Sequence, residues 1–365
     1  MATRALVAEL RRAAIPYARV DTADPLDELG NRGSWSVHNT RLAFTHLLSA
    51  LRKSFSRKVG AVYVPIAQAF PGLVRDIGFL LIAQAARRPV IVHLHGGAFG
   101  DFYASQTSPT RLLLRLTVGR AAVGIVLTES LRPALECVLP PERVSVVSNG
   151  IDVPNAPDQR VASDNTTRVL FLSSLHRRKG PLVFIEAFAR AHRECTFLRG
   201  TVAGAWPSDE IRIETLGLAR DLGVEGVLSF PGSVVGETKQ ALFQSADIFC
   251  FASLVPEGQP LVILEAMAAG LPVVAPAWPG IADTVVDGET GLLVREASPE
   301  ALASKLVGLG RNSDLRLRLG AAGRQRYEGF FTQDAFGDRM IQLIRPFVDR
   351  GGEPVRATKA RETAR

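Results

Sequence analysis

Two glutamates separated by seven residues mark the segment with the clearest chemical potential. Glu257 and Glu265 lie in EGQPLVILEAMAAGLPVVAP, residues 257–276, where Gly258 allows close backbone approach and Pro260 suits a first helical position. A helix starting there would present free N–H groups and a positive dipole end to an anion, for which a diphosphate is the natural guest. Glu257 would lie within reach of the group attached to the diphosphate, and Glu265 could accept hydrogen bonds from sugar hydroxyls. An ordinary capped helix with a surface glutamate fits the spacing equally well.

The elements that must position these residues alternate between apolar runs and helical patterns, as in βαβ units. The pattern predicts two α/β domains with parallel sheets. Strands are expected at 61–66, 89–95, 123–128 and 144–148, and then at 168–174, 197–204, 227–232, 248–253 and 271–276. Helices are expected at 40–54, 72–86, 181–193, 208–222, 237–245 and 260–269, with a helical stretch from Glu300 to about Phe347.

The beginning of the chain departs from a doubly wound domain, which opens with a strand and a glycine-rich turn. Here a helical pattern over residues 2–13 comes first, followed by YARVDT, 17–22, as an expected strand. We therefore expect roughly 20–30 residues carrying a strand and glycine turn to be absent or encoded upstream. A form extended upstream should then be more soluble and more active, and equal melting temperature and turnover of the two forms would contradict this.

Composition and charge narrow the class of protein. The chain has 365 residues, 47% hydrophobic and 22% charged, which suits two globular domains. No apolar run approaches the roughly 20 residues of a membrane span, the N-terminus lacks a signal-peptide pattern, and three scattered cysteines suit a reduced, cytoplasmic protein. Of the net charge of +7, the first 160 residues carry 19 basic against 12 acidic side chains.

This basic half fits either a solvated surface or peripheral contact with an anionic membrane. Arg52, Lys53, Arg57 and Lys58 follow an apolar helical stretch and are the expected contact residues. Nucleic acid is not expected as a partner, because no binding motif or aromatic stacking platform accompanies the charge.

Several motifs together resemble one family. Glu257 and Glu265 resemble the E-x(7)-E signature of the retaining glycosyltransferases of family 4, which have the GT-B fold. SLHRRKG (174–180), VSNGID (147–152), HLHGGAF (93–99) and PGIADTVVDGETGLLV (279–294) agree with that family in order and spacing. The resemblance covers roughly residues 60–345 and implies an α/β chain of two facing Rossmann-like domains with a deep interdomain cleft, the N-terminal domain lacking its first strand.

The resemblance also implies a division of the chain. Residues 1–155 would form the acceptor-side domain and 165–325 the nucleotide-sugar-binding domain, joined by a polar linker at 154–168. A C-terminal helix, 326–348, would cross back to the first domain, and the tail, 351–365, is expected to be disordered.

The resemblance implies a role for each residue that stands at a matching position of the family's motifs. His95 resembles the histidine near the reacting sugar carbon, and Glu257 the residue near the transferred sugar; these are the expected catalytic residues. Lys179 resembles the diphosphate lysine and Glu265 the ribose-binding carboxylate. The remaining expected substrate-binding positions are Ser174, Arg177, Arg178, Gly232 (after Pro231, at the nucleobase), Gly258, Gln259, Pro260 and Leu261. Ser174 stands where the family has an arginine, so Arg177 or Arg178 would have to supply that charge. Lys179 and His95 would each also fit a purely structural role.

The implied reaction is transfer of a sugar from a nucleotide-diphosphate sugar to a hydroxyl acceptor with retention, in polysaccharide or glycolipid biosynthesis. No D-x-D motif occurs, so we expect no metal and no cofactor beyond the co-substrate. Front-face attack is favoured, because no second carboxylate is placed as a nucleophile. The donor would be a uridine or guanosine diphosphate sugar. The acceptor would be a saccharide or a lipid-linked molecule. A non-catalytic sugar-nucleotide-binding pseudoenzyme and an inverting GT-B enzyme remain as alternatives.

Overall fold

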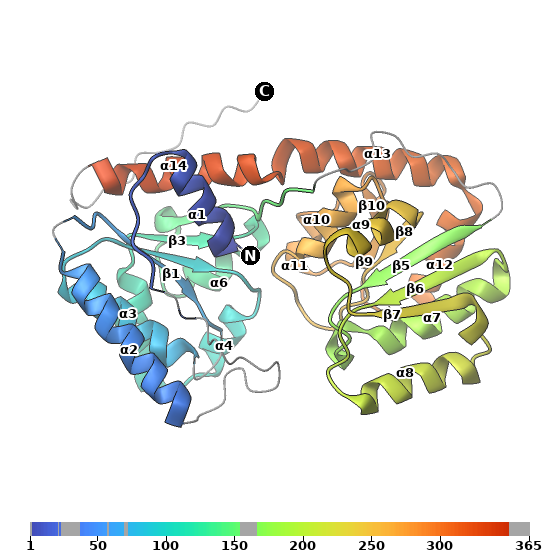
Figure 1. Ribbon diagram of the computed structural model, residues 1–365, viewed down its shortest axis with the longest axis horizontal. Coiled ribbons are helices and arrows are strands. Elements are labelled where there is room, and N and C mark those ends of the chain that lie inside the picture. The colour runs from blue at the N-terminus through green and yellow to red at the C-terminus, as the bar shows by residue number, and fades with distance from the viewer. Residues whose placement is uncertain are drawn as a thin grey trace. The chain divides into compact units, whose positions relative to one another are not determined.

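The computed structural model describes residues 2–20, 22, 37–56, 58–68, 72–153 and 166–349 (Figure 1). The chain divides into two compact units. Unit 1 consists of residues 1–148 and 336–365, and unit 2 of residues 149–335. Most of the expected linker and the whole expected tail lie outside the described residues. Each unit is an α/β layer structure built on its own sheet.

The sheet of unit 1 is parallel and has the strand order β1-β2-β3-β4. All five residues of β2 are buried, which is typical of a parallel strand covered on both faces. Each of the four strands was predicted from its apolar run, and each is confirmed. Their bounds are β1 Val62–Ile66, β2 Val90–Leu94, β3 Val123–Val126 and β4 Val144–Val146.

Helices cover both faces of this sheet. On one face the strands pack against α3 (Gly72–Ala85), α4 (Phe99–Ser105), α5 (Ser108–Thr117) and α6 (Arg132–Glu136), in a core that includes Val92, Leu80 and Leu114. On the other face, Ile91 and Ile125 pack against Leu6 of α1 (Ala2–Arg12) and against α14 (Gln333–Asp349). The α14 side chains in this core are Phe336, Met340, Ile344 and Phe347, which follow helical spacing.

The prediction of a strand at 17–22 is wrong for the residues described there. Residues 17–20 and 22 form no strand, and most of them are exposed. A strand needs a hydrogen-bonded neighbour, and the described sheet begins at β1, which pairs only with β2. The segment instead follows α1 as extended chain, and Lys53 Nζ donates to the Arg19 carbonyl at 2.5 Å. The expected helix at 40–54 is confirmed as α2 (Val37–Ser54), which packs on α3.

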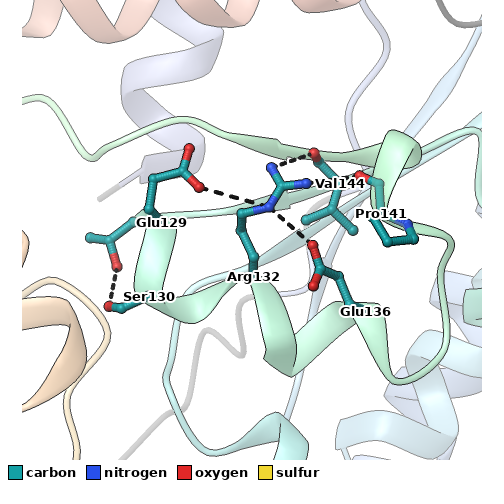
Figure 2. A network of polar contacts seen from close by, with 7 residues as sticks. Glu129, Ser130, Arg132, Glu136, Pro141 and Val144 are labelled. Atoms are coloured by element: carbon teal, nitrogen blue, oxygen red, sulfur yellow. Dashed lines mark hydrogen bonds and ion pairs between the residues drawn. The ribbon is translucent and has the colours of Figure 1, made fainter.

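An arginine holds the last strand of unit 1 in place (Figure 2). Arg132, at the start of α6, donates to the carbonyls of Val144 at 2.9 Å and Pro141 at 2.8 Å. Its Nε also donates to the Glu136 carboxylate, one turn along the same helix, at 3.0 Å. Since β4 has only three residues, these side-chain contacts fix its position relative to α6.

The sheet of unit 2 is parallel, with the order β10-β9-β8-β5-β6-β7. Five of its strands were predicted and are confirmed, although β8 and β9 are shorter than expected. The sixth, β10, lies within the segment that was recognised only as a motif. The bounds are β5 Thr167–Leu172, β6 Leu198–Ala203, β7 Leu228–Gly232, β8 Ile248–Cys250, β9 Val273–Pro276 and β10 Gly291–Val294.

Two separate cores lie on the two faces of this sheet, which makes unit 2 doubly wound. One core includes α7 (Pro181–Glu194), α8 (Asp209–Asp221) and α12 (Pro299–Arg311). The other includes α9 (Gly236–Ser245), α10 (Leu261–Ala268) and α11 (Pro279–Ala282). The C-terminal helical stretch is not continuous, because Asn312 caps α13 (Ser313–Phe330) and Thr332 interrupts the chain before α14.

Candidate functional site

The strand order of unit 2 locates a binding crevice. From β5 the chain proceeds to β6 and β7 on one side, and β8, β9 and β10 lie on the other. In open parallel sheets, ligands bind beyond the carboxyl ends of the strands, where the order reverses. That point lies between β5 and β8, so the loops that follow these two strands are the ones expected to hold a ligand. They contain the expected phosphate lysine and the first glutamate of the E-x(7)-E pair.

The structure joins these two loops directly. The Leu254 N–H donates to the Arg178 carbonyl at 2.9 Å, and a Cβ on Gly180 would lie only 2.0 Å from the Ala252 carbonyl oxygen. Gly180 has φ of 73°, so it is also in the left-handed region that favours glycine. The glycine therefore lets the loop after β5 close onto the loop after β8.

Lys179 and Glu257 meet across this joint. The Lys179 ammonium donates to the Glu257 carboxylate, and Ser253 Oγ donates to the same oxygen at 2.7 Å. Lys179 Nζ also lies 5.9 Å from the centroid of the Phe251 ring. The two charged side chains are 19% and 15% exposed, so both are reachable from solvent and both are partly desolvated. A diphosphate at this point would find a fixed cation beside the start of α10.

The turn that precedes α10 is held by a buried side chain. Gln259 is 5% exposed, and its Oε1 accepts from the Asn149 backbone N–H at 2.7 Å. The Asn149 side chain donates to the Gln259 carbonyl at 3.2 Å, and Gln259 Nε2 donates to Thr284 Oγ1 at 3.2 Å. The side chain and the carbonyl of Gln259 thus position the turn, which leaves its backbone N–H to face a ligand. Pro260 caps α10, and no side chain caps that helix start by a hydrogen bond.

Gly280 lets α11 pack against this turn. A Cβ at Gly280 would lie 1.3 Å from the Gly258 carbonyl oxygen and 2.8 Å from that of Glu257. We expect Gly280→Ala to displace residues 257–260 and to lower the free energy of unfolding by about 1–3 kcal/mol, the usual cost of overpacking.

Chemical denaturation and nucleotide titration of Gly280→Ala check this prediction together. Gly217→Ala in α8 is the matched control, because a Cβ there meets nothing within 4 Å. Unchanged stability and unchanged nucleotide affinity in Gly280→Ala would show that the close approach is not required.

Glu265 lies inside α10 and has one free oxygen. Its Oε1 accepts from Lys239 Nζ of α9 at 2.6 Å, while its buried Oε2 has no hydrogen-bond partner among the described residues. Burial raises the pKa of Glu265, and the Lys239 ammonium opposes that rise. A buried, unpartnered carboxylate oxygen is costly, and a hydroxyl donor from a ligand would satisfy it. Lys239 was not predicted, because a lysine one turn into a helix carries no motif.

The remaining expected substrate-binding residues of unit 2 differ in the contacts that they make within the protein. Arg177 forms an exposed ion pair with Glu214 of α8 at 2.6 Å. Arg178 and Ser174 are exposed, and the Arg178 guanidinium makes no hydrogen bond or ion pair within the described part of the chain. Gly232 ends β7 in the left-handed region at φ 74°, and its carbonyl accepts from Gly204 at 2.8 Å. Arg178 is therefore the arginine of this loop that is free to contact an anion.

His95 belongs to unit 1, at the carboxyl end of β2. Its ring lies 4.0 Å from that of His93, centroid to centroid. His93 is completely buried, and its Nδ1 is 2.7 Å from the Tyr63 hydroxyl. After β1, Gln68 Oε1 accepts from the Ala98 N–H at 2.9 Å and lies over Gly96. The two sequence-predicted groups, His95 and the residues of unit 2, thus come from different units.

Burial keeps the His95 imidazole neutral. It lowers the pKa of His95 to about 4 and lowers the pKa of His93 well below its usual value. Unfolded histidines bind protons below about pH 6.5, whereas folded His95 does so only near pH 4. The stability from this effect is therefore complete above pH 6.5 and is lost as the pH falls through this window.

The free energy of unfolding of the parent should decline between pH 6.5 and 4, and we expect His95→Gln to reduce this decline. The reduction should reach up to about 3 kcal/mol at the lower pH. Comparing the variant with the parent cancels the opposite contributions of Asp76 and Glu265, whose pKa values are raised by burial. Urea unfolding at several pH values measures this. Parallel pH profiles of the two proteins would contradict it.

Within the described residues, no cluster of three or more His, Cys, Asp or Glu side chains is arranged to hold a metal ion. None of the described helices combines the length and apolarity needed to cross a bilayer.

Comparison with solved structures defines the class of fold. The chain matches Anabaena Alr3699/HepE in complex with UDP and glucose with a TM-score of 0.67 and 20% identity, over 83% of this chain and 82% of the other. It matches sucrose-phosphate synthase from Thermosynechococcus elongatus with a TM-score of 0.69 and 20% identity, over 90% and 82%. With its two parallel α/β units, the chain has the GT-B fold, as predicted.

Most of unit 2 matches a known family in sequence. Residues 166–312 match the Glycosyl transferases group 1 family, and this range contains Lys179, Glu257 and Glu265 but not His95. The putative colanic acid biosynthesis glycosyltransferase WcaL of Salmonella typhimurium is 28% identical over 212 residues, 56% of this chain and 52% of the relative. The D-inositol 3-phosphate glycosyltransferase of Corynebacterium glutamicum is 34% identical over 194 residues, 49% and 46%. The chain spans about half the length of these relatives.

Proposed function

We propose that the chain is a glycosyltransferase that moves a sugar from a nucleotide-diphosphate sugar to a hydroxyl acceptor, with retention at the anomeric carbon, as in the family 4 enzymes. The observation that carries this proposal is the contact of Lys179 with Glu257, at the switch point of the sheet and inside the glycosyl transferases group 1 domain. A cation, a carboxylate and an uncapped helix start at one place suit a diphosphate that carries a sugar.

Each residue has a role in this proposal. The acceptor oxygen bonds to the anomeric carbon while the bond from that carbon to the diphosphate oxygen breaks, and the acceptor proton passes to the departing phosphate. Lys179, Arg178 and the start of α10 stabilise the charge that develops on the phosphate, so that no metal ion is required. Glu265 accepts from the ribose hydroxyls through Oε2, and Glu257 lies near the transferred sugar. Neutral His95 donates to a sugar hydroxyl.

The compared proteins suggest the substrate class. HepE was solved with UDP and glucose, WcaL is named for colanic acid biosynthesis, and another relative is named a D-inositol 3-phosphate glycosyltransferase. We infer a uridine or guanosine diphosphate sugar as donor and a saccharide or lipid-linked acceptor, used in polysaccharide or glycolipid synthesis. The protein would act in the cytoplasm, at the inner face of the membrane.

A panel of sugar nucleotides tests the proposal with the full chain. A donor that binds should raise the melting temperature, since ligand at about 100 times its Kd adds about 2.7 kcal/mol of stability. The stabilising donor is then incubated with candidate acceptors, and NMR determines the anomeric configuration of the product. Inversion would contradict the mechanism. Binding without hydrolysis or transfer would instead identify a sugar-nucleotide-binding pseudoenzyme.

A further inference from the structure

Helix α2 exposes a stripe of large apolar side chains. Phe44 is 62% exposed and Leu48 42%, and Leu51 and, just after the helix, Phe55 are 41% and 55% exposed. Their spacing of four, three and four residues places them on one side of the helix. Exposed large apolar residues are ordinary when scattered, but a contiguous set marks an interaction surface.

The neighbouring helix extends this stripe. Val74 and Leu81 of α3 are also exposed, at 45% and 47%, and they lie seven residues apart on one side of that helix. Leu47 of α2 packs over Gly78, which lies between them in the sequence, so the two helices meet closely there. Figure 1 shows α2 and α3 running side by side. We call the surface formed by Phe44, Leu48, Leu51, Phe55, Val74 and Leu81 the α2–α3 face.

Among the described residues of α2 and α3, the exposed charged side chains beside the α2–α3 face are all basic. Helix α2 contains no Asp or Glu, and its Arg41 and Arg52 are exposed. At 100° per residue, these two arginines lie along one edge of the stripe, on the side away from the buried residues of the helix. The acidic residue of α3, Asp76, is buried and bonded to Arg75. An apolar surface with basic groups at its edge is complementary to anionic headgroups above an acyl layer.

We propose that the α2–α3 face docks unit 1 on an anionic lipid bilayer, with α2 lying in the plane of the interface. The apolar side chains enter the boundary between headgroups and acyl chains, and Arg41 and Arg52 contact the lipid phosphates. A second copy of the chain fits this surface less well, because a two-fold contact would bring the same arginines together without an exposed acidic partner on α2 or α3. The proposal does not depend on the transfer reaction.

Vesicle flotation without any sugar nucleotide tests the docking. Vesicles are made of phosphatidylcholine alone or of phosphatidylcholine with phosphatidylglycerol. The full chain should float with the anionic vesicles at low salt and be released as salt screens the charges. A triple Leu48→Ser, Leu51→Ser, Phe55→Ser variant and an Arg41→Glu, Arg52→Glu variant should each lose about tenfold or more in partitioning.

Matched controls come from other surfaces of the chain. Ile213→Ser with Val235→Ser removes exposed apolar residues from unit 2, and Arg143→Glu with Arg318→Glu makes the same change of charge elsewhere. Both should bind like the parent. Equal recovery on neutral and anionic vesicles, or a triple variant that still floats, would overturn the proposal. If the parent does not float and the triple variant has a lowered melting temperature, another part of the chain itself packs on this face, and the proposal is wrong. A parent dimer that the triple variant abolishes, without vesicle binding, would identify a second copy as the occupant.

Discussion

Lys179→Ala should lower kcat by about 10²–10³-fold, because it removes a preorganised cation from the point where charge develops on the leaving diphosphate. The side chain is already fixed by Glu257 and by the Phe251 ring, so little reorganisation is needed when the donor binds. Initial rates at saturating donor and acceptor measure the effect. Lys179→Arg, which keeps the positive charge, should recover part of the lost rate.

The control for this change is Arg190→Ala on α7, the helix that begins directly after Lys179. Arg190 forms an exposed ion pair with Glu300 at 2.6 Å, and such pairs contribute about 0–1 kcal/mol. Its turnover should match that of the parent. If Lys179→Ala keeps its fold and its kcat stays within about threefold of the parent, the diphosphate is not bound at this lysine.

Glu265→Ala should weaken binding of the nucleoside diphosphate by about 10- to 150-fold, because the ribose hydroxyls lose a charged acceptor worth about 1.5–3 kcal/mol. The unpartnered, buried Oε2 is the atom expected to accept from the ribose. Glu257→Ala should instead reduce turnover more than nucleotide affinity. Isothermal titration calorimetry and initial rates separate the two effects.

Lys239→Ala shows whether the effect of Glu265 is direct. This variant breaks the contact to Glu265 Oε1 but leaves Oε2 in place. If Lys239→Ala and Glu265→Ala weaken nucleotide binding equally, the ion pair rather than a ribose contact explains the loss. An unchanged dissociation constant in Glu265→Ala would remove Glu265 from the site.

Much of the fold follows from apolar periodicity in the sequence. Buried parallel strands such as Val90–Leu94, which is apolar except for His93, are nearly continuous apolar runs, and they need no tertiary information to be recognised. Residues 17–22 resembled a strand by composition, but pairing and burial decide whether such a segment joins a sheet, and neither is encoded locally. The four-residue β10 is too short and too closely followed by polar residues to stand out.

The candidate site also contains residues that local sequence predicts and residues that it does not. The loop that carries Lys179, the turn that carries Glu257 and the helix that carries Glu265 were found because motif spacing reflects a local strand-to-helix turn. The contacts of Lys239 with Glu265 and of Gln259 with Asn149 join residues 26 and 110 positions apart. Such contacts depend on the order of strands and helices in space, which the spacing of residues along one segment does not encode.

The bond between Asn149 and the turn before α10 determines where unit 2 can be excised. A fragment that starts at Thr167, just after the expected linker, would leave the buried amide of Gln259 without its Asn149 partners. It would also remove Ile151, whose carbonyl accepts from the Tyr327 hydroxyl at 2.9 Å and from the Gln333 N–H at 3.0 Å. A fragment of unit 2 should therefore begin at Asn149, because its first few residues act as an N-terminal arm that completes the turn before α10.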